Sequence, residues 1–140
     1  MRSDPLIEGL LNRLRGQIMA SQHAMWNLGV AAACKECEDE EGGSCCGAGI
    51  ENRYTSFLLL MNLLLGESLP EKRSYENSCF FLGKTGCTLK ARDTICVNYL
   101  CLKIQNRLHA DAIIKLQEIT GEEMDTTFRL HEAIKRFIDR

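Results

Sequence analysis

The chain has 140 residues, of which 45% are hydrophobic and 26% are charged, and its formal net charge is −2 at pH 7. This composition is typical of a folded globular protein, and the length predicts a single domain over residues 1–140. A slightly acidic chain lacks the basic surface that nonspecific nucleic-acid binding requires, so no nucleic-acid partner is expected. The unusual feature is the number of cysteines, eight in one small domain.

The sequence contains no predicted signal peptide and no predicted membrane span. Glu8, Arg13 and Arg15 interrupt the first apolar stretch, which excludes the continuous apolar core of a secretory signal. The most apolar run covers residues 57–65, whereas a bilayer requires about 20 apolar residues, so no membrane association is expected. We therefore expect a cytoplasmic protein, in a compartment where structural disulfides are rare. Eight cysteines in that compartment favour metal or redox chemistry.

The first predicted element is a long helix over residues 5–33. Asp4 can cap its free N–H groups, and Pro5 fits the first helical position. Apolar residues then recur at steps of three and four positions as far as Val30, which is the spacing of an amphipathic helix. Residues 34–49 lose this periodicity and contain four cysteines and four glycines, so they are predicted to form a loop.

A second, shorter helix is predicted over residues 56–65, with Gly66 as its C-terminal cap. It is apolar on nearly every side, so we expect it in the centre of the packing. Residues 79–87 combine a short apolar run with two glycines, which predicts a tight turn or hairpin.

The C-terminal half is predicted to be helical. Asp93 or Thr94 can cap a third helix over residues 95–120, and Thr120 with Glu123 has the capping-box spacing that would begin a last helix. Flanking helices over residues 5–33 and 95–139 thus enclose a cysteine motif region over residues 34–101. The expected fold class is mostly α: a small helical bundle with two irregular cysteine-rich metal-binding loops.

The cysteines fall into two groups, and all eight are candidate metal ligands. The first group is Cys34, Cys37, Cys45 and Cys46, and the second is Cys79, Cys87, Cys96 and Cys101. A C-x2-C turn lets two sulfur atoms converge on one ion. Structural zinc takes four such ligands, and iron–sulfur clusters are also held by four cysteines.

The spacing leaves the grouping of the ligands open. Proximity in the sequence favours two groups that each close on themselves. However, the neighbouring side chains of Cys45 and Cys46 point in different directions, which favours mixing. Because the entropy of loop closure rises only slowly with loop length, we expect Cys34 and Cys37 to share a site with the second group.

The cysteine pattern resembles a known family, the cysteine-cluster proteins described as zinc- or iron-chelating domains. The residues that carry the resemblance are Cys34, Cys37 and Cys45-Cys46; Cys79-Phe80-Phe81-Leu82 and Gly86-Cys87-Thr88-Leu89; and Arg92, Cys96, Tyr99 and Cys101. It covers about residues 34–101 and implies a metal or iron–sulfur site. Asp93 and Val97 stand where the family usually has Pro and Arg.

Three hypotheses about function follow. The first is a metal-binding protein with a cysteine-ligated iron–sulfur cluster, such as 4Fe–4S, or with zinc, acting in electron transfer, in sensing or as an accessory to a protein partner that is unknown. The second is a cluster- or dithiol-dependent redox enzyme with Cys34 and Cys37 as the redox pair. The third is an interaction module held together by structural zinc. The resemblance favours iron–sulfur, and no catalytic residue is predicted.

Overall fold

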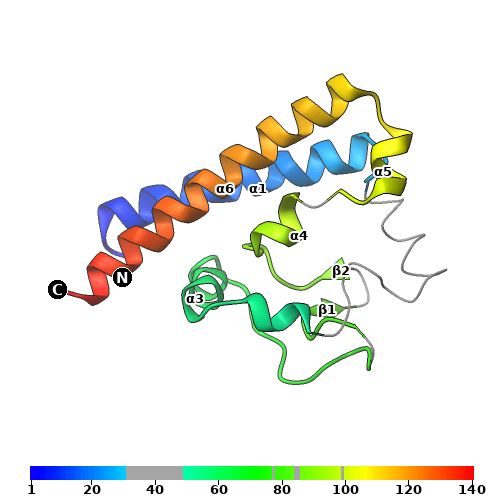
Figure 1. Cartoon of the computed structure of the whole chain (residues 1–140). Helices are drawn as coiled ribbons and strands as arrows, with labels where there is room; N and C mark the ends of the chain where they lie inside the picture. Colours follow the sequence, from blue (N-terminus) through cyan, green and yellow to red (C-terminus); the bar gives the residue numbers. More distant parts are fainter. Residues whose placement is uncertain (31–48, 77, 84–85, 99) are drawn as a thin grey trace.

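Two long helices lie side by side in the fold (Figure 1). The computed structural model describes residues 1–30, 49–76, 78–83, 86–98 and 100–140. The long helices are α1 (Pro5–Asn27) and α6 (Ala110–Ile138), and they run antiparallel. The shorter elements are a 3-10 helix η1 (Ile50–Arg53), α3 (Ser56–Leu64), β1 (Leu82–Gly83), β2 (Gly86–Cys87), α4 (Thr94–Asn98) and α5 (Leu102–Arg107). Over the described residues, the mostly helical fold class is confirmed.

Helix α1 begins as predicted but ends earlier. The Asp4 carboxylate accepts hydrogen bonds from the N–H groups of Leu6 and Ile7 at 3.0 and 3.1 Å, and Pro5 occupies the first helical position. Helix α1 ends at Asn27, so an unbroken helix over residues 5–33 is wrong, although Val30 is again helical. Gly29 has a φ of +77°, a left-handed conformation that glycine adopts without steric cost and that stops a helix. Residues 31–33 lie outside the described part of the chain.

The flanking helix predicted over residues 95–139 is interrupted. Asp93 caps α4 as expected, because its carboxylate accepts a hydrogen bond from the Ile95 N–H at 3.1 Å. Helix α4 then ends at Asn98, and α5 begins only after Cys101. The helical path is therefore broken between the two cysteines of this region.

The boundary predicted near residue 120 is also wrong, because α6 runs without a break from Ala110 to Ile138. The hydroxyl of Thr120 donates to the carbonyl oxygen of Leu116 at 3.0 Å, one turn earlier in the same helix. It therefore satisfies a bond within α6 and does not cap a new helix.

The main apolar core lies between α1, α3 and α6, and α3 contributes to its centre as expected. Its buried members are Ile7, Leu10, Leu11, Leu14, Ile18, Leu58, Met61, Leu64, Leu65, Ala91, Leu130, Ala133 and Ile134. Burying one large aliphatic side chain of this kind contributes about 1.5–3 kcal/mol. One of its members, Ala91, lies in the segment between the hairpin and α4.

The side chain of Asn62 is buried in this core, and its amide makes four hydrogen bonds. Its Nδ2 donates to the carbonyl oxygens of Leu58 at 3.0 Å and Ala91 at 2.8 Å. Its Oδ1 accepts from the N–H groups of Lys90 at 2.8 Å and Ala91 at 2.9 Å. Asn62 therefore joins α3 to the segment that leads from the hairpin to α4.

The interface between α1 and α6 contains a buried carboxyl group. Glu123 on α6 is only 2% exposed and lies beside the fully buried Ser21 of α1. Burial raises the pKa of Glu123 above its ordinary value of 4.5, while the Ser21 hydroxyl and the Arg92 guanidinium act in the opposite direction. Thr120 and Thr126 lie three positions before and after Glu123 on α6 and are also buried, so this part of the interface is polar.

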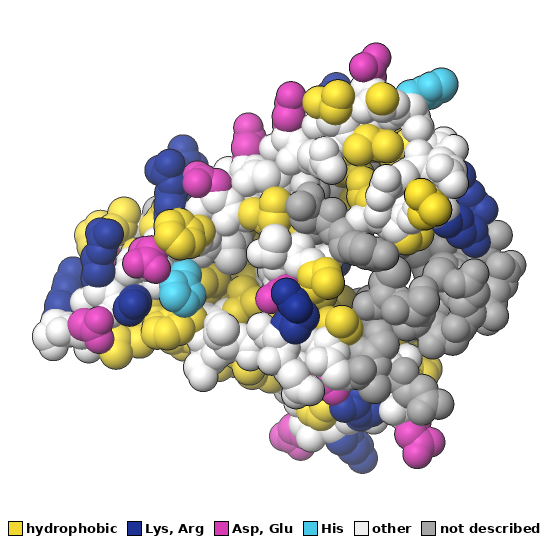
Figure 2. All heavy atoms as spheres, viewed as in Figure 1, with side chains coloured by type: hydrophobic (Ala, Val, Ile, Leu, Met, Phe, Trp, Pro, Cys, Tyr) yellow, Lys and Arg dark blue, Asp and Glu magenta, His cyan; other side chains and the backbone are white. Residues whose placement is uncertain are grey.

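The surface carries charges of both signs. Figure 2 shows Lys and Arg side chains interspersed with Asp and Glu over the visible face. Exposed ion pairs such as Arg129 with Asp125, at 3.0 Å, contribute little to stability. In the part of the chain that the structure describes, no helix is both long and apolar enough to cross a membrane.

Replacing Asn62 is expected to destabilise the fold strongly. In Asn62→Leu the carbonyl group of Ala91 and the N–H groups of Lys90 and Ala91 lose their side-chain partners. A buried polar group without a partner costs about 1–3 kcal/mol, so the free energy of unfolding should fall by about 3 kcal/mol or more in urea denaturation. Asn106→Leu, at an exposed position of α5, is the control. An unchanged urea midpoint for Asn62→Leu would contradict this role.

Removing the buried charge at Glu123 is expected to stabilise the protein at neutral pH. The folded state binds the proton of the Glu123 carboxyl group more tightly than the unfolded state does. Stability is therefore lost as the pH rises from about 4.5 through the raised pKa of Glu123. Glu123→Gln should therefore raise the melting temperature by a few degrees at pH 7.5, and the gain should shrink towards pH 4. Circular dichroism melts from pH 4 to 8 measure this, with the exposed Glu122→Gln as control. A gain independent of pH would argue against a buried charge.

Candidate metal centre

The structure describes one of the two predicted cysteine groups. Cys79, Cys87, Cys96 and Cys101 are described, and each carries a free thiol. The cysteines of the first group are Cys34, Cys37, Cys45 and Cys46, and they lie outside the described residues, as does most of the loop predicted over residues 34–49.

Cys79 lies three positions before β1, and Cys87 ends β2. The pairing of the two strands confirms the hairpin predicted over residues 79–87, of which residues 84 and 85 lie outside the described part. The strands pair antiparallel, with Leu82 opposite Cys87, and the Leu82 N–H donates to the Cys79 carbonyl oxygen at 3.0 Å. Cys79 is buried with Phe81, Leu82 and Leu89 in a second apolar cluster, against which Cys87 packs. We call this set of residues the hairpin cluster.

Cys96 of α4 is connected to the hairpin cluster by Tyr54. The Tyr54 hydroxyl donates a hydrogen bond to the Cys96 Sγ at 3.3 Å. The Tyr54 ring packs edge-on against the Phe81 ring, with the ring centroids 5.0 Å apart. One aromatic side chain therefore contacts both cysteine-bearing segments.

An ion pair on η1 positions the segment that carries Cys79. The Glu51 carboxylate pairs with the guanidinium group of Arg73. The same guanidinium donates to the carbonyl oxygen of Ser78, the residue before Cys79, and lies 5.9 Å from the centre of the Phe80 ring. The backbone at Cys79 is thus held against η1.

A second ion pair on η1 positions α4. Arg53 lies 3.2 Å from the carboxylate of Asp93, which also caps the helix that carries Cys96. Asp93 stands where the resembled family usually has Pro. Its two contacts explain what an aspartate contributes here, because proline could neither cap α4 nor pair with Arg53.

The surroundings keep the two hairpin thiols protonated. Burial raises the pKa of Cys79 and of Cys87 above the ordinary value of 9.0, and the neighbouring Cys96 raises both further. Arg73 lowers the pKa of Cys79 and Arg92 lowers that of Cys87, but burial outweighs both. Neither thiol is therefore an activated nucleophile at neutral pH.

Cys101 belongs to a different neighbourhood. It is the N-cap residue of α5 and packs against a third apolar cluster formed by Val30, Leu100, Ile104 and Leu116. The structure therefore brings Cys79, Cys87 and Cys96 together and leaves Cys101 apart. Within the described residues, no three His, Cys, Asp or Glu side chains form a set that could hold a metal ion.

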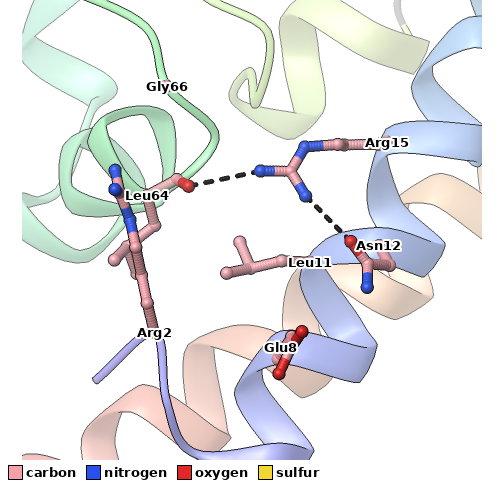
Figure 3. A pocket seen from close by; sticks show the side chains of 7 residues that line it. All are labelled: Arg2, Glu8, Leu11, Asn12, Arg15, Leu64 and Gly66. Carbon is pink, nitrogen blue, oxygen red and sulfur yellow. Dashed lines mark hydrogen bonds between the residues drawn. The ribbon is translucent and has the colours of Figure 1, made fainter.

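The cavity drawn in Figure 3 lies between α1 and the end of α3, and none of the described cysteines lines it. Its volume is about 310 Å³. Arg2 donates to the carbonyl oxygen of Leu63 at 2.8 Å, and Arg15 donates to that of Leu64 at 3.4 Å. The last carbonyl groups of a helix lack partners within it and attract cations. The arginines of this cavity thus stabilise the end of α3.

The residues that organise the cysteines were not identified from the sequence. The contacts of Tyr54, Arg53 and Arg73 span 42, 40 and 22 positions, respectively, and none of the three residues belongs to a recognisable motif. The available signal was the adjacent pair Arg53-Tyr54 between the predicted loop and the second helix. A charged and an aromatic residue at such a boundary suggest tertiary contacts but do not identify the partners.

Comparison of the chain with known protein families, with curated proteins and with solved structures finds no match. The resemblance of the cysteine pattern to zinc- or iron-chelating domains therefore stays an expectation.

Proposed function

We propose that the chain is a metal-binding protein whose cysteine thiolates hold an iron–sulfur cluster or zinc. The observation that supports this is the approach of Cys79, Cys87 and Cys96 from different segments to the Tyr54–Phe81 pair. Soft thiolate ligands select zinc and iron–sulfur clusters among the common biological metals. When bound, the group would supply electron transfer or sensing as a cluster, or structural cross-linking as zinc.

The protonation of Cys79 and Cys87 argues against metal-free thiol chemistry at these two residues. A dithiol enzyme needs a thiolate at neutral pH, and burial raises the pKa of Cys79 and of Cys87. A metal ion instead displaces the thiol protons when it binds, so its binding compensates for this burial. The alternative redox pair, Cys34 with Cys37, stays a hypothesis about residues outside the described part.

The described residue Val30 supports a ligand set that mixes the two cysteine groups. Val30 is buried in the same apolar cluster that Cys101 contacts. Cys34 follows Val30 by four positions, and four residues of chain span at most about 14 Å. The length of the chain therefore permits Cys34 to share a metal with Cys101.

The same argument from chain length applies to the other end of the first cysteine group. Ile50 packs against the hairpin cluster with Cys79 and Cys87. Cys46 precedes Ile50 by four positions, so the same limit of about 14 Å applies. The length of the chain thus permits cysteines at both ends of the first group to share a metal with cysteines of the second group. We propose mixed ligand sets in a cytoplasmic protein whose thiols stay reduced.

Metal analysis of protein purified without oxygen tests the proposal. We expect a stoichiometric amount of metal: iron with matching acid-labile sulfide and a brown colour for a cluster, or zinc in a colourless protein. The variant with Cys79, Cys87 and Cys96 all replaced by Ser should lose most of that metal, because it removes the three neighbouring thiols. Wild-type protein with neither metal above background would overturn the proposal.

Counting metal in Cys→Ser variants tests the mixed grouping. If Cys34 and Cys101 ligate the same metal, Cys34→Ser and Cys101→Ser should each remove it, and the double variant should lose no more than either single variant. Losses that add up in the double variant would show separate sites for the two groups. Circular dichroism of each variant checks that the helices remain.

A further inference from the structure

The position of Tyr54 is determined from several sides. Its ring packs against both the main core and the hairpin cluster, and it meets Phe81 edge-on. Its backbone N–H ends η1 by donating to the carbonyl oxygen of Glu51 at 3.2 Å. The ring therefore has little freedom, and its hydroxyl is directed at the Cys96 Sγ, 3.3 Å away.

The Tyr54 hydroxyl remains a hydrogen-bond donor under ordinary conditions. A tyrosine hydroxyl can both donate and accept a hydrogen bond, whereas a metal-bound thiolate sulfur can only accept one. The Tyr54 hydroxyl is therefore the donor of this pair, and the Cys96 sulfur is the acceptor.

We propose that Tyr54 is a positioning residue of the metal centre, whose hydroxyl donates a hydrogen bond to the Cys96 sulfur while that sulfur ligates the metal. This inference rests on the proposed metal-binding function. A hydrogen bond to an ionised acceptor is stronger than one to a neutral acceptor, so metal binding strengthens the contact. Such a bond orients the ligand, withdraws electron density from the sulfur and, for an iron–sulfur cluster, changes the reduction potential.

The role of the hydroxyl can be separated from that of the ring. Tyr54→Phe keeps the ring, and with it the contacts with Phe81 and the two apolar clusters, and removes only the donor. Tyr75→Phe is the matched control, because Tyr75 is 41% exposed. If Tyr54 acted only by packing, the Tyr54→Phe variant would bind metal as the wild type does.

The probe is Co²⁺ alone, added without oxygen to the reduced, metal-free full chain in competition with a chelator. We expect Tyr54→Phe to bind Co²⁺ about tenfold more weakly, the lower end of the effect of losing a ligand's hydrogen-bond partner. The sulfur-to-cobalt charge-transfer band should also move to lower energy, because the sulfur then donates more electron density. Tyr75→Phe should change neither quantity.

The same titration in a Cys96→Ser background shows whether Tyr54 acts through that sulfur. There, Tyr54→Phe should have no further effect on affinity or on the remaining band. An effect of the same size in both backgrounds would overturn the inference, as would wild-type affinity and band position in the single Tyr54→Phe variant. Either result leaves the proposed function standing if the wild type binds Co²⁺. Wild-type protein that binds no Co²⁺ would overturn both.

Discussion

The buried amide of Asn62 is the contact on which the cysteine-bearing part of the molecule depends. It pairs with the backbone at Lys90 and Ala91, in the segment between the hairpin and α4. That segment is short, so its attachment to α3 determines two positions. These are the end of the hairpin, at Cys87, and the start of α4, the helix that carries Cys96. A residue that interrupts an otherwise apolar helix thus connects the core to the candidate metal centre.

The core and the candidate centre also share side chains, so a metal bound at that centre would be coupled to folding. Tyr54 packs against both apolar clusters, and Arg92 influences the pKa of Cys87 on one side and of Glu123 in the helix pair on the other. A metal held by the cysteines would therefore bind to a surface that the helices already organise. Ligands that bind only the folded state add to its stability.

Local signals predicted where several helices begin or end, and tertiary packing decided the rest. Asp4, Gly66 and Asp93 act at short range, and each lies at a helix end as expected. Gly29 lies inside the helix predicted over residues 5–33, and Gly121 lies beside the boundary predicted near residue 120. Of these two glycines only Gly29 adopts a left-handed conformation, whereas Gly121 lies within α6 between the buried Thr120 and Glu123. The number of cysteines indicated metal chemistry, but the contacts that position them join residues about 40 positions apart, which no local pattern encodes.

The ends of the chain meet at one end of the α1–α6 pair. The Arg140 guanidinium lies 3.4 Å from the carboxylate of Asp4, and Figure 1 shows both termini away from the hairpin and α5. A short peptide could therefore join residue 140 to residue 1, so that the chain could be opened at another point and still fold as a circular permutant. For the same reason, protein attached to an electrode through either terminus would present its cysteine-bearing region to the solution.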